Sequence, residues 1–151
     1  MSIDAAGAGT DTVDARIPRF TATVTLAVML TALAVAAVNT RAAAVILAIQ
    51  AVVFAIGAVG GPRRHPYGMV FSQFIAGDSA STTPGEDVSL LKFSQSIGFV
   101  VSTVGVIGFA SGHPALGAAA IGFAAFAAFM RAAFGICLAR RAHTLVQRLR
   151  G

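Results

Sequence analysis

The sequence contains 151 residues, of which 56% are hydrophobic and only 11% are charged, and its mean hydropathy is +0.80. Soluble globular proteins carry about 25% charged residues, because water must solvate their surface. The composition therefore excludes a soluble enzyme, a disordered chain and a disulfide scaffold, and it indicates an integral membrane protein.

The chain begins with a polar segment followed by two apolar runs. Residues 1–15 contain acids and lack the cleavage pattern of a secretory leader, so we expect a disordered cytoplasmic tail. Roughly 20 apolar residues in a helix span a bilayer core about 30 Å thick. Residues 21–38 and 42–59 are such runs. Because only three residues separate them, these two spans must run antiparallel.

The predicted cytoplasmic loop, residues 60–92, contains an aromatic stretch followed by a flexible linker rich in Gly, Ser, Thr and Pro. Apolar side chains in the first part recur at helical spacing. They are Tyr67, Val70, Phe71, Phe74 and Ile75. A short helix of this kind would lie in the headgroup layer or pack onto the bundle as a cap, and the pattern allows both.

Residues 93–111 and 115–138 form a second pair of spans joined by a short turn. The predicted fold is therefore all-α, with four transmembrane helices arranged as two antiparallel hairpins. The four-span membrane domain covers residues 16–142, and a basic cytoplasmic tail covers residues 143–151. The segment from Leu138 onward has a basic amphipathic pattern that extends the fourth span.

Basic residues are concentrated on one side of the predicted membrane. With four spans, both tails and the central loop lie on the same side, which carries nine basic residues against Arg41 alone on the other side. Cytoplasmic loops carry such an excess. We therefore expect a multi-pass inner (plasma) membrane protein with both termini cytoplasmic. The nine are Arg16, Arg19, Arg63, Arg64, Lys92, Arg140, Arg141, Arg148 and Arg150.

The net charge of +5 predicts contact with the anionic headgroups of membrane lipids. Nucleic acid is not an expected partner, because the basic residues flank the spans and have no interleaved aromatic platform for bases.

The segments that precede the two hairpins resemble each other. Residues 19–24 read RFTATV and residues 92–97 read KFSQSI, and a basic pair follows each hairpin. This similarity indicates a parallel duplication of a two-helix unit. The alternative is that every cytoplasmic boundary attracts basic and aromatic residues.

Gln50 lies near the middle of the second span, where an amide needs a hydrogen-bond partner. We expect Ser102 or Thr103 to supply it. The contact would be either a hydrogen bond that stabilises helix packing or part of a polar path. Two rows of small residues are expected to face each other or another span. They are Ala120, Ala124, Ala128 and Ala132 in the fourth span, and Ser94, Gly98 and Ser102 in the third.

Arg131 is the one ionisable residue well inside a span, roughly 10 Å below the predicted cytoplasmic boundary. Its side chain can extend toward the headgroups and meet a lipid, or it can hold a specific anion or substrate. No span contains Asp or Glu. Because a proton or cation pump normally keeps a carboxylate in the membrane, this argues against such a pump.

Cys137 is the one cysteine and lies near the end of the fourth span. It is expected to be a packing residue, or a thiol whose pKa the neighbouring Arg140 and Arg141 lower. The three histidines, His65, His113 and His143, show no metal-ligand spacing. No cofactor or metal motif is present, and no catalytic pattern of nucleophile and base occurs.

Four segments in order resemble a bacterial membrane family known as domain of unknown function 4395. They are PRFTATVTLAV, AVVFAIGAVGGPRRHPYGMVF, KFSQSIGFVVSTVGVIGFA and AAFGICLARR, and the likeness covers about residues 14–142. The most specific block contains Arg63, Arg64 and Tyr67.

The resemblance implies a small four-span fold, often encoded beside thioredoxin-like or sulfurtransferase genes. Many members of the family carry a Cys-x-x-Cys pair at the end of the last span, which would suit thiol exchange. Here Cys137 matches the first cysteine and Arg140 occupies the second position, so this chain lacks the dithiol.

The leading hypothesis is a non-enzymatic membrane anchor or accessory subunit for a cytoplasmic, thioredoxin-like or sulfurtransferase partner. Its alternatives are a small transporter or channel subunit that acts as a homo-oligomer, and a membrane thiol oxidoreductase relative without the second cysteine. The candidate functional residues are Gln50, Arg63, Arg64, Tyr67, Arg131 and Cys137.

Overall fold

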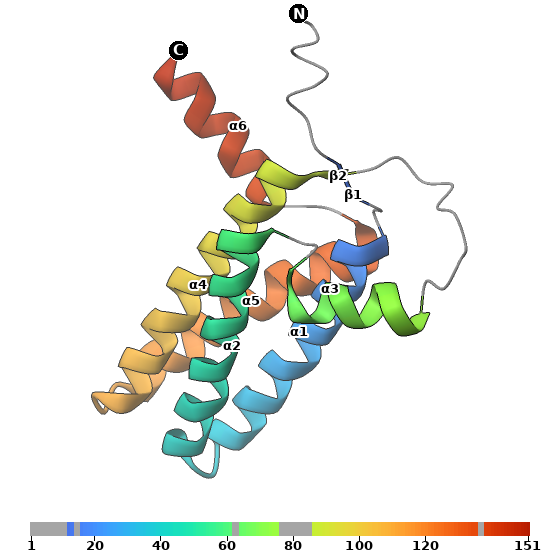
Figure 1. Cartoon of the computed structure of the whole chain (residues 1–151). Coiled ribbons are helices and arrows are strands. Elements are labelled where there is room, and N and C mark those ends of the chain that lie inside the picture. The colour runs from blue at the N-terminus through green and yellow to red at the C-terminus, as the bar shows by residue number, and fades with distance from the viewer. Residues whose placement is uncertain (1–11, 14–15, 62–63, 76–85, 136–137) are drawn as a thin grey trace, which may run out of the picture.

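The computed structural model describes residues 12–13, 16–61, 64–75, 86–135 and 138–151. It contains four long helices: α1 (Arg16–Ala36), α2 (Thr40–Gly60), α4 (Val88–Ala110) and α5 (Pro114–Phe134) (Figure 1). Each is long and apolar enough to cross a membrane. This confirms the predicted all-α fold with four candidate transmembrane helices.

Shorter elements lie at the ends of this bundle. Helix α3 (Pro66–Val70) continues directly into a π-helical turn, η2 (Phe71–Ile75), and helix α6 spans Leu138–Arg150. Two-residue strands β1 (Thr12–Val13) and β2 (Glu86–Asp87) pair antiparallel. Within the predicted N-terminal tail, residues 12–13 form strand β1, while residues 1–11 and 14–15 lie outside the described part of the chain.

Local backbone chemistry sets the helix boundaries. The Asn39 side chain accepts a hydrogen bond from the backbone N–H of Ala42 and caps the start of α2. Gly135 ends α5 in the left-handed conformation, with φ of 70°, which favours glycine. Helix α5 therefore stops at Phe134, whereas the apolar run in the sequence predicts a span up to residue 138.

The two hairpins are V-shaped. Figure 1 shows α1 and α2 meeting at their connecting turn and diverging toward the end of the bundle that carries α3 and α6. Helix α2 packs most extensively on α4, and α1 packs on α5, so the arms of one hairpin are held mainly by the other hairpin. We call the half near the two turns the closed half, and the half away from them the open half.

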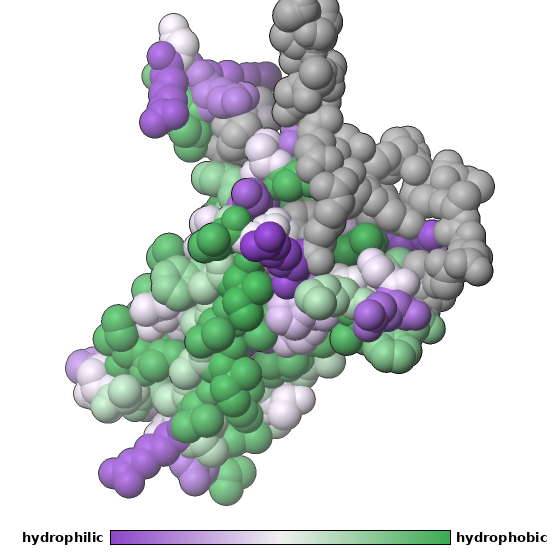
Figure 2. Space-filling model, in the orientation of Figure 1, coloured by the Kyte–Doolittle hydropathy of each residue, from purple (hydrophilic) through white to green (hydrophobic). Residues whose placement is uncertain are grey.

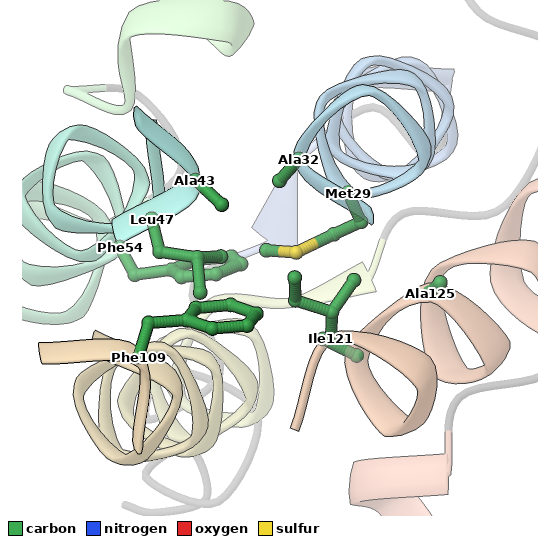
Figure 3. Close-up of a cluster of buried hydrophobic side chains, with 9 residues drawn as sticks. Met29, Ala32, Ala43, Leu47, Phe54, Phe109, Ile121 and Ala125 are labelled. Carbon is green, nitrogen blue, oxygen red and sulfur yellow. The ribbon is translucent and has the colours of Figure 1, made fainter. Parts of the chain in front are cut away.

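The closed half is tightly packed. Its centre is a cluster of buried apolar side chains, in which Met29, Leu47 and Ile121 point toward one another (Figure 3). Glycines allow α4 and α5 to approach closely, because a Cβ atom on Gly108 would lie 2.7 Å from the backbone nitrogen of Gly117. Helices in lipid commonly pack by close approach through small residues, because the hydrophobic effect does not drive their association there.

The outer surface matches a membrane environment. Figure 2 shows apolar residues along the length of the helices and hydrophilic residues at the two ends of the bundle. Large apolar side chains on α2 are more than half exposed, among them Val45, Ile49 and Val52. In a protein that worked in water, an exposed apolar surface of this extent would cause aggregation.

Candidate functional site: a polar cavity in the open half of the bundle

A partly open cavity of about 180 Å³ lies between the diverging arms of the two hairpins. Its wall comes from the first part of α1, the first part of α4 and the last part of α5, with Phe54 of α2 and the residue before α3. The cavity therefore occupies the open half. Most of its wall is apolar, and the polar residues in it are Thr21, Thr25, His65, Ser94, Gln95 and Arg131.

The small-residue rows form part of this wall. Ala124 and Ala128 line it from α5, while Ser94 and Gly98 line it from α4. The aromatic ring of Phe54 fills the space beside Gly98, since a Cβ there would lie 2.8 Å from the ring. The two rows thus share a cavity in the open half instead of packing directly against each other along their whole length.

His65 is a buried cavity residue and is 1% exposed. It lies between α2 and α3, where its Nδ1 accepts a hydrogen bond of 3.3 Å from the backbone N–H of Tyr67 and caps α3. This contact places the ring proton on Nε2. Among the described residues, Nε2 has no hydrogen-bond partner. This N–H is therefore a buried donor that lies close to the Gln95 side chain.

Burial lowers the pKa of His65 from its ordinary value of 6.5 to about 4, and the Gln95 side chain beside it acts in the opposite direction. Desolvation disfavours the charged imidazolium. The ring is consequently neutral throughout the physiological pH range, and Nε2 stays a donor of fixed polarity. Within the described residues, no group of three or more potential metal ligands occurs.

Thr25 lines the cavity and is 5% exposed. Hydroxyl groups in these helices commonly donate to the backbone carbonyl four residues earlier. Those that do so are Thr23, Thr31, Ser96, Thr103 and Ser111. Thr25 Oγ1 makes no hydrogen bond to any described residue. Its hydroxyl is therefore a buried polar group without a described partner.

Arg131 lies in the last turn of α5, lines the cavity and is 8% exposed. The sequence predicts an extended side chain that reaches the headgroups or one that holds an anion. The structure places the residue inside the bundle with most of its surface covered. Its positive charge acts in a low-dielectric environment, where electrostatic interactions are much stronger than in water.

Gln50 is 1% exposed, and its partner differs from the predicted one. Its Oε1 accepts a hydrogen bond of 2.7 Å from the Tyr67 hydroxyl group. The expectation of Ser102 or Thr103 is wrong. Thr103 bonds to the carbonyl of Phe99, and Ser102 Oγ, although buried, has no partner among the described residues. The chain reverses after α2, which brings Tyr67 back onto this helix.

The Tyr67 contact is part of a cap formed by α3 and η2. Burial raises the pKa of the Tyr67 hydroxyl, while its hydrogen bond to Gln50 acts in the opposite direction, so the phenol stays protonated and donates. The ring of Phe71 is buried and lies 5.4 Å from Phe20 of α1, centroid to centroid. Arg16 of α1 lies over the same ring, 5.7 Å from its centroid. This aromatic segment therefore caps the bundle, with Tyr67 and Phe71 packed inward and Phe74 exposed.

Two further candidates from the sequence, Arg63 and Cys137, lie outside the described residues. Arg64 is described and is exposed, and its side chain packs over Gly60 at the end of α2. It does not line the cavity. Of the predicted site residues, Gln50 and Tyr67 are in direct contact with each other. Arg131 lines the cavity together with residues that the sequence did not single out, such as His65 and Thr25.

Sequence reasoning missed most of the cavity. His65 has only the general signal of a histidine beside a span, and Thr25 looks like any other span hydroxyl. Gln95, which lines the cavity with its Oε1 unbonded within the described residues, resembles a polar boundary residue.

The fold and the cavity define a multi-pass membrane protein with four long helices around a partly open, partly polar cavity. The chain belongs to the family described as domain of unknown function (DUF4395), whose model matches residues 13–148. This match confirms the resemblance seen in the sequence. No significant match to a curated protein or a solved structure was found.

Proposed function

We propose that the protein binds a small molecule in the cavity of the open half, and that it does so without catalysing a reaction. One observation carries this proposal. His65 and Thr25 line a partly open cavity and are almost fully buried, and their Nε2 and Oγ1 atoms have no hydrogen-bond partner among the described residues.

Unbonded polar groups are costly inside a protein. Each buried donor without a partner costs about 1–3 kcal/mol, and native structures keep few of them. A ligand with suitable polar atoms would remove this cost on binding. The size of the cavity also fits such a role, because an apolar cavity of about 150 Å³ binds benzene, and this one has about 180 Å³.

The first prediction concerns ligand-dependent stability. Purified protein in a non-ionic detergent is expected to unfold at a higher temperature with at least one of three ring-sized probes: benzoate, benzamide or benzyl alcohol. Replacing Ala128 with leucine should abolish this shift, because the larger side chain projects into the cavity. The measurement is the midpoint of thermal unfolding. It is monitored by the fluorescence of an added dye or by light scattering, because the chain contains no tryptophan.

The matched control is Ala133→Leu, since Ala133 is exposed on the same helix and does not line the cavity. It should keep the wild-type response. If no probe raises the midpoint of the wild type, or if Ala128→Leu responds as the wild type does, the cavity is not a binding site.

A second candidate function is the anchor or accessory subunit for a cytoplasmic partner, and α6 favours it. This helix extends away from the four-helix body (Figure 1). It carries Arg148 and Arg150 in its last turn, with Leu145 and Leu149 more than half exposed. A helix with basic and apolar faces can bind a protein partner or an anionic lipid surface. This role requires α6 to lie on the cytoplasmic side.

The second prediction tests that orientation at the plasma membrane. The excess of basic residues near α6 and the cap favours cytoplasmic termini. In a Cys137→Ser background, a cysteine at Val38 in the turn after α1 should react with a membrane-impermeant maleimide on intact cells. A cysteine at Thr144 in α6 should react only after the cells are broken. Both positions are exposed, so accessibility within the fold is matched. Labelling of position 144 in intact cells would show that α6 lies outside the cell. That result would rule out the proposed accessory role.

A further inference from the structure

We infer that α6 lies on the surface of the membrane as an interfacial helix and binds anionic lipid headgroups there. The inference goes beyond the proposed ligand binding, because the cavity plays no part in it. It also chooses between the two kinds of partner that the second candidate function leaves open for this helix. The chosen partner is the lipid leaflet that surrounds the bundle.

The last part of α6 exposes an apolar face. Residues 144–150 are all exposed, and Leu145 and Leu149 are more than half exposed. These two leucines lie four residues apart, which places them on one face of the helix, with Val146 beside them. Isolated helices shorter than about 12–15 residues are marginal in water. With its 13 residues, α6 is therefore expected to be stabilised by a surface that covers this face.

The charge of α6 has a single sign. Its sequence, LARRAHTLVQRLR, contains four arginines and no acid. Arg148 and Arg150 come directly before and after Leu149, so helical geometry places one on each side of the apolar face. An interfacial helix has this arrangement, because its apolar face enters the boundary between headgroups and hydrocarbon while the flanking arginines extend to the lipid phosphates.

The position of α6 also favours lipid as its partner. It begins at Leu138, three residues after α5 ends at Phe134, and α5 is a candidate membrane span. The start of α6 is therefore expected at the level of the headgroups. Figure 1 shows α6 turning aside from the line of the long helices. Arg19 and Arg64 are exposed at the same end of the bundle, so α6 extends a basic surface that complements an anionic leaflet.

Fluorescence of the full chain in lipid nanodiscs tests this inference. In a Cys137→Ser background, an environment-sensitive dye is attached through Leu145→Cys on the apolar face, or through Gln147→Cys on the opposite face as the matched control. With phosphatidylglycerol in the nanodiscs, a nitroxide on the lipid acyl chains should quench the dye at position 145 several-fold more than the dye at 147. With phosphatidylcholine alone, quenching at position 145 should be several-fold weaker.

The contribution of charge is tested with Arg148→Gln and Arg150→Gln. Each replacement should lower the ratio of docked to undocked α6 in the anionic nanodiscs about fivefold, which corresponds to about 1 kcal/mol. High salt should weaken docking in the same direction, because it screens exposed charges. The matched control is Arg41→Gln, which removes an exposed charge from the opposite end of the bundle and should leave the quenching unchanged.

Three results would overturn the inference. The first is equal quenching at position 145 in both kinds of nanodisc, and the second is equal quenching at positions 145 and 147. The third is a dye at position 145 that stays in water in anionic nanodiscs and is shielded only when a cytoplasmic extract is added, which would make the partner a protein. Because both faces of a nanodisc have the same lipids, none of these results depends on the orientation of the protein. Failure here therefore leaves cavity binding and the cytoplasmic position of α6 standing.

Discussion

Replacing Gly108 with alanine is expected to lower the thermal unfolding midpoint of the protein in detergent, because the added methyl group has no room. A Cβ atom at this position would lie 2.7 Å from the backbone nitrogen of Gly117 and 3.2 Å from its Cα. Backbone atoms cannot rotate away as a flexible side chain can, so α4 and α5 must separate. Overpacking of this kind costs about 1–3 kcal/mol.

Gly122→Ala is the matched control for the helical effect of the substitution. Gly122 lies in α5, and a Cβ there meets no atom within 4 Å. Alanine is favoured over glycine in a helix by about 1 kcal/mol, so this variant should be as stable as the wild type or more stable. The two glycine-to-alanine substitutions are thus expected to change stability in opposite directions. This difference isolates the contact between Gly108 and Gly117. A Gly108→Ala protein that unfolds at the wild-type temperature would show that the V-shaped hairpin does not close at this point.

The second large effect is expected at Tyr67. Tyr67→Phe removes the hydroxyl group that donates to Gln50 Oε1 and leaves this buried oxygen without its described partner. The loss of free energy of unfolding is expected to be about 1–3 kcal/mol. The measurement is the change in unfolding free energy or midpoint in detergent.

A double-mutant cycle separates the hydrogen bond from ring packing. Gln50→Leu replaces the amide with an apolar side chain, so adding Tyr67→Phe to it should cost much less than Tyr67→Phe alone. Removing both partners of a buried hydrogen bond leaves neither polar group unsatisfied. If Tyr67→Phe destabilises both backgrounds equally, the interaction between Tyr67 and Gln50 makes no contribution and the cap is held by packing alone.

This contact also links the cap to the cavity. His65 lines the cavity two residues before Tyr67, and its ring packs so closely on α2 that a Cβ on Gly57 would lie 2.5 Å from it. The hydrogen bond of Tyr67 to Gln50 therefore holds the start of α3 against α2. Loss of this bond is expected to loosen the position of the His65 donor as well as the cap.

Much of the architecture follows from local features of the sequence. Four apolar runs of about 20 residues, separated by two very short turns, are enough to predict four helices in two hairpins, because the length of a span depends on hydropathy summed along the chain. The end of α5 is an exception. Gly135 stops the helix through its backbone conformation, and hydropathy does not report that signal.

The sequence also indicates which polar residues are unusual, but not what they contact. Arg131 and Gln50 are conspicuous because charged and amide groups are rare in spans. The partner of Gln50 is 17 residues away in a cap whose position depends on how the chain reverses after α2. Spacing along a helix predicts neighbours on the same helix and cannot predict this contact.

By itself, then, the sequence determined the membrane class, the number of spans, their pairing into hairpins and the family. Tertiary structure alone decided that a cavity exists and that His65, Thr25 and Arg131 share it. The reason is physical. Helix formation and membrane insertion depend on residues close together in the chain, whereas a cavity depends on the angle at which helices cross. That angle is set by contacts such as Gly108 with Gly117 and Phe54 with Gly98, which no single segment encodes.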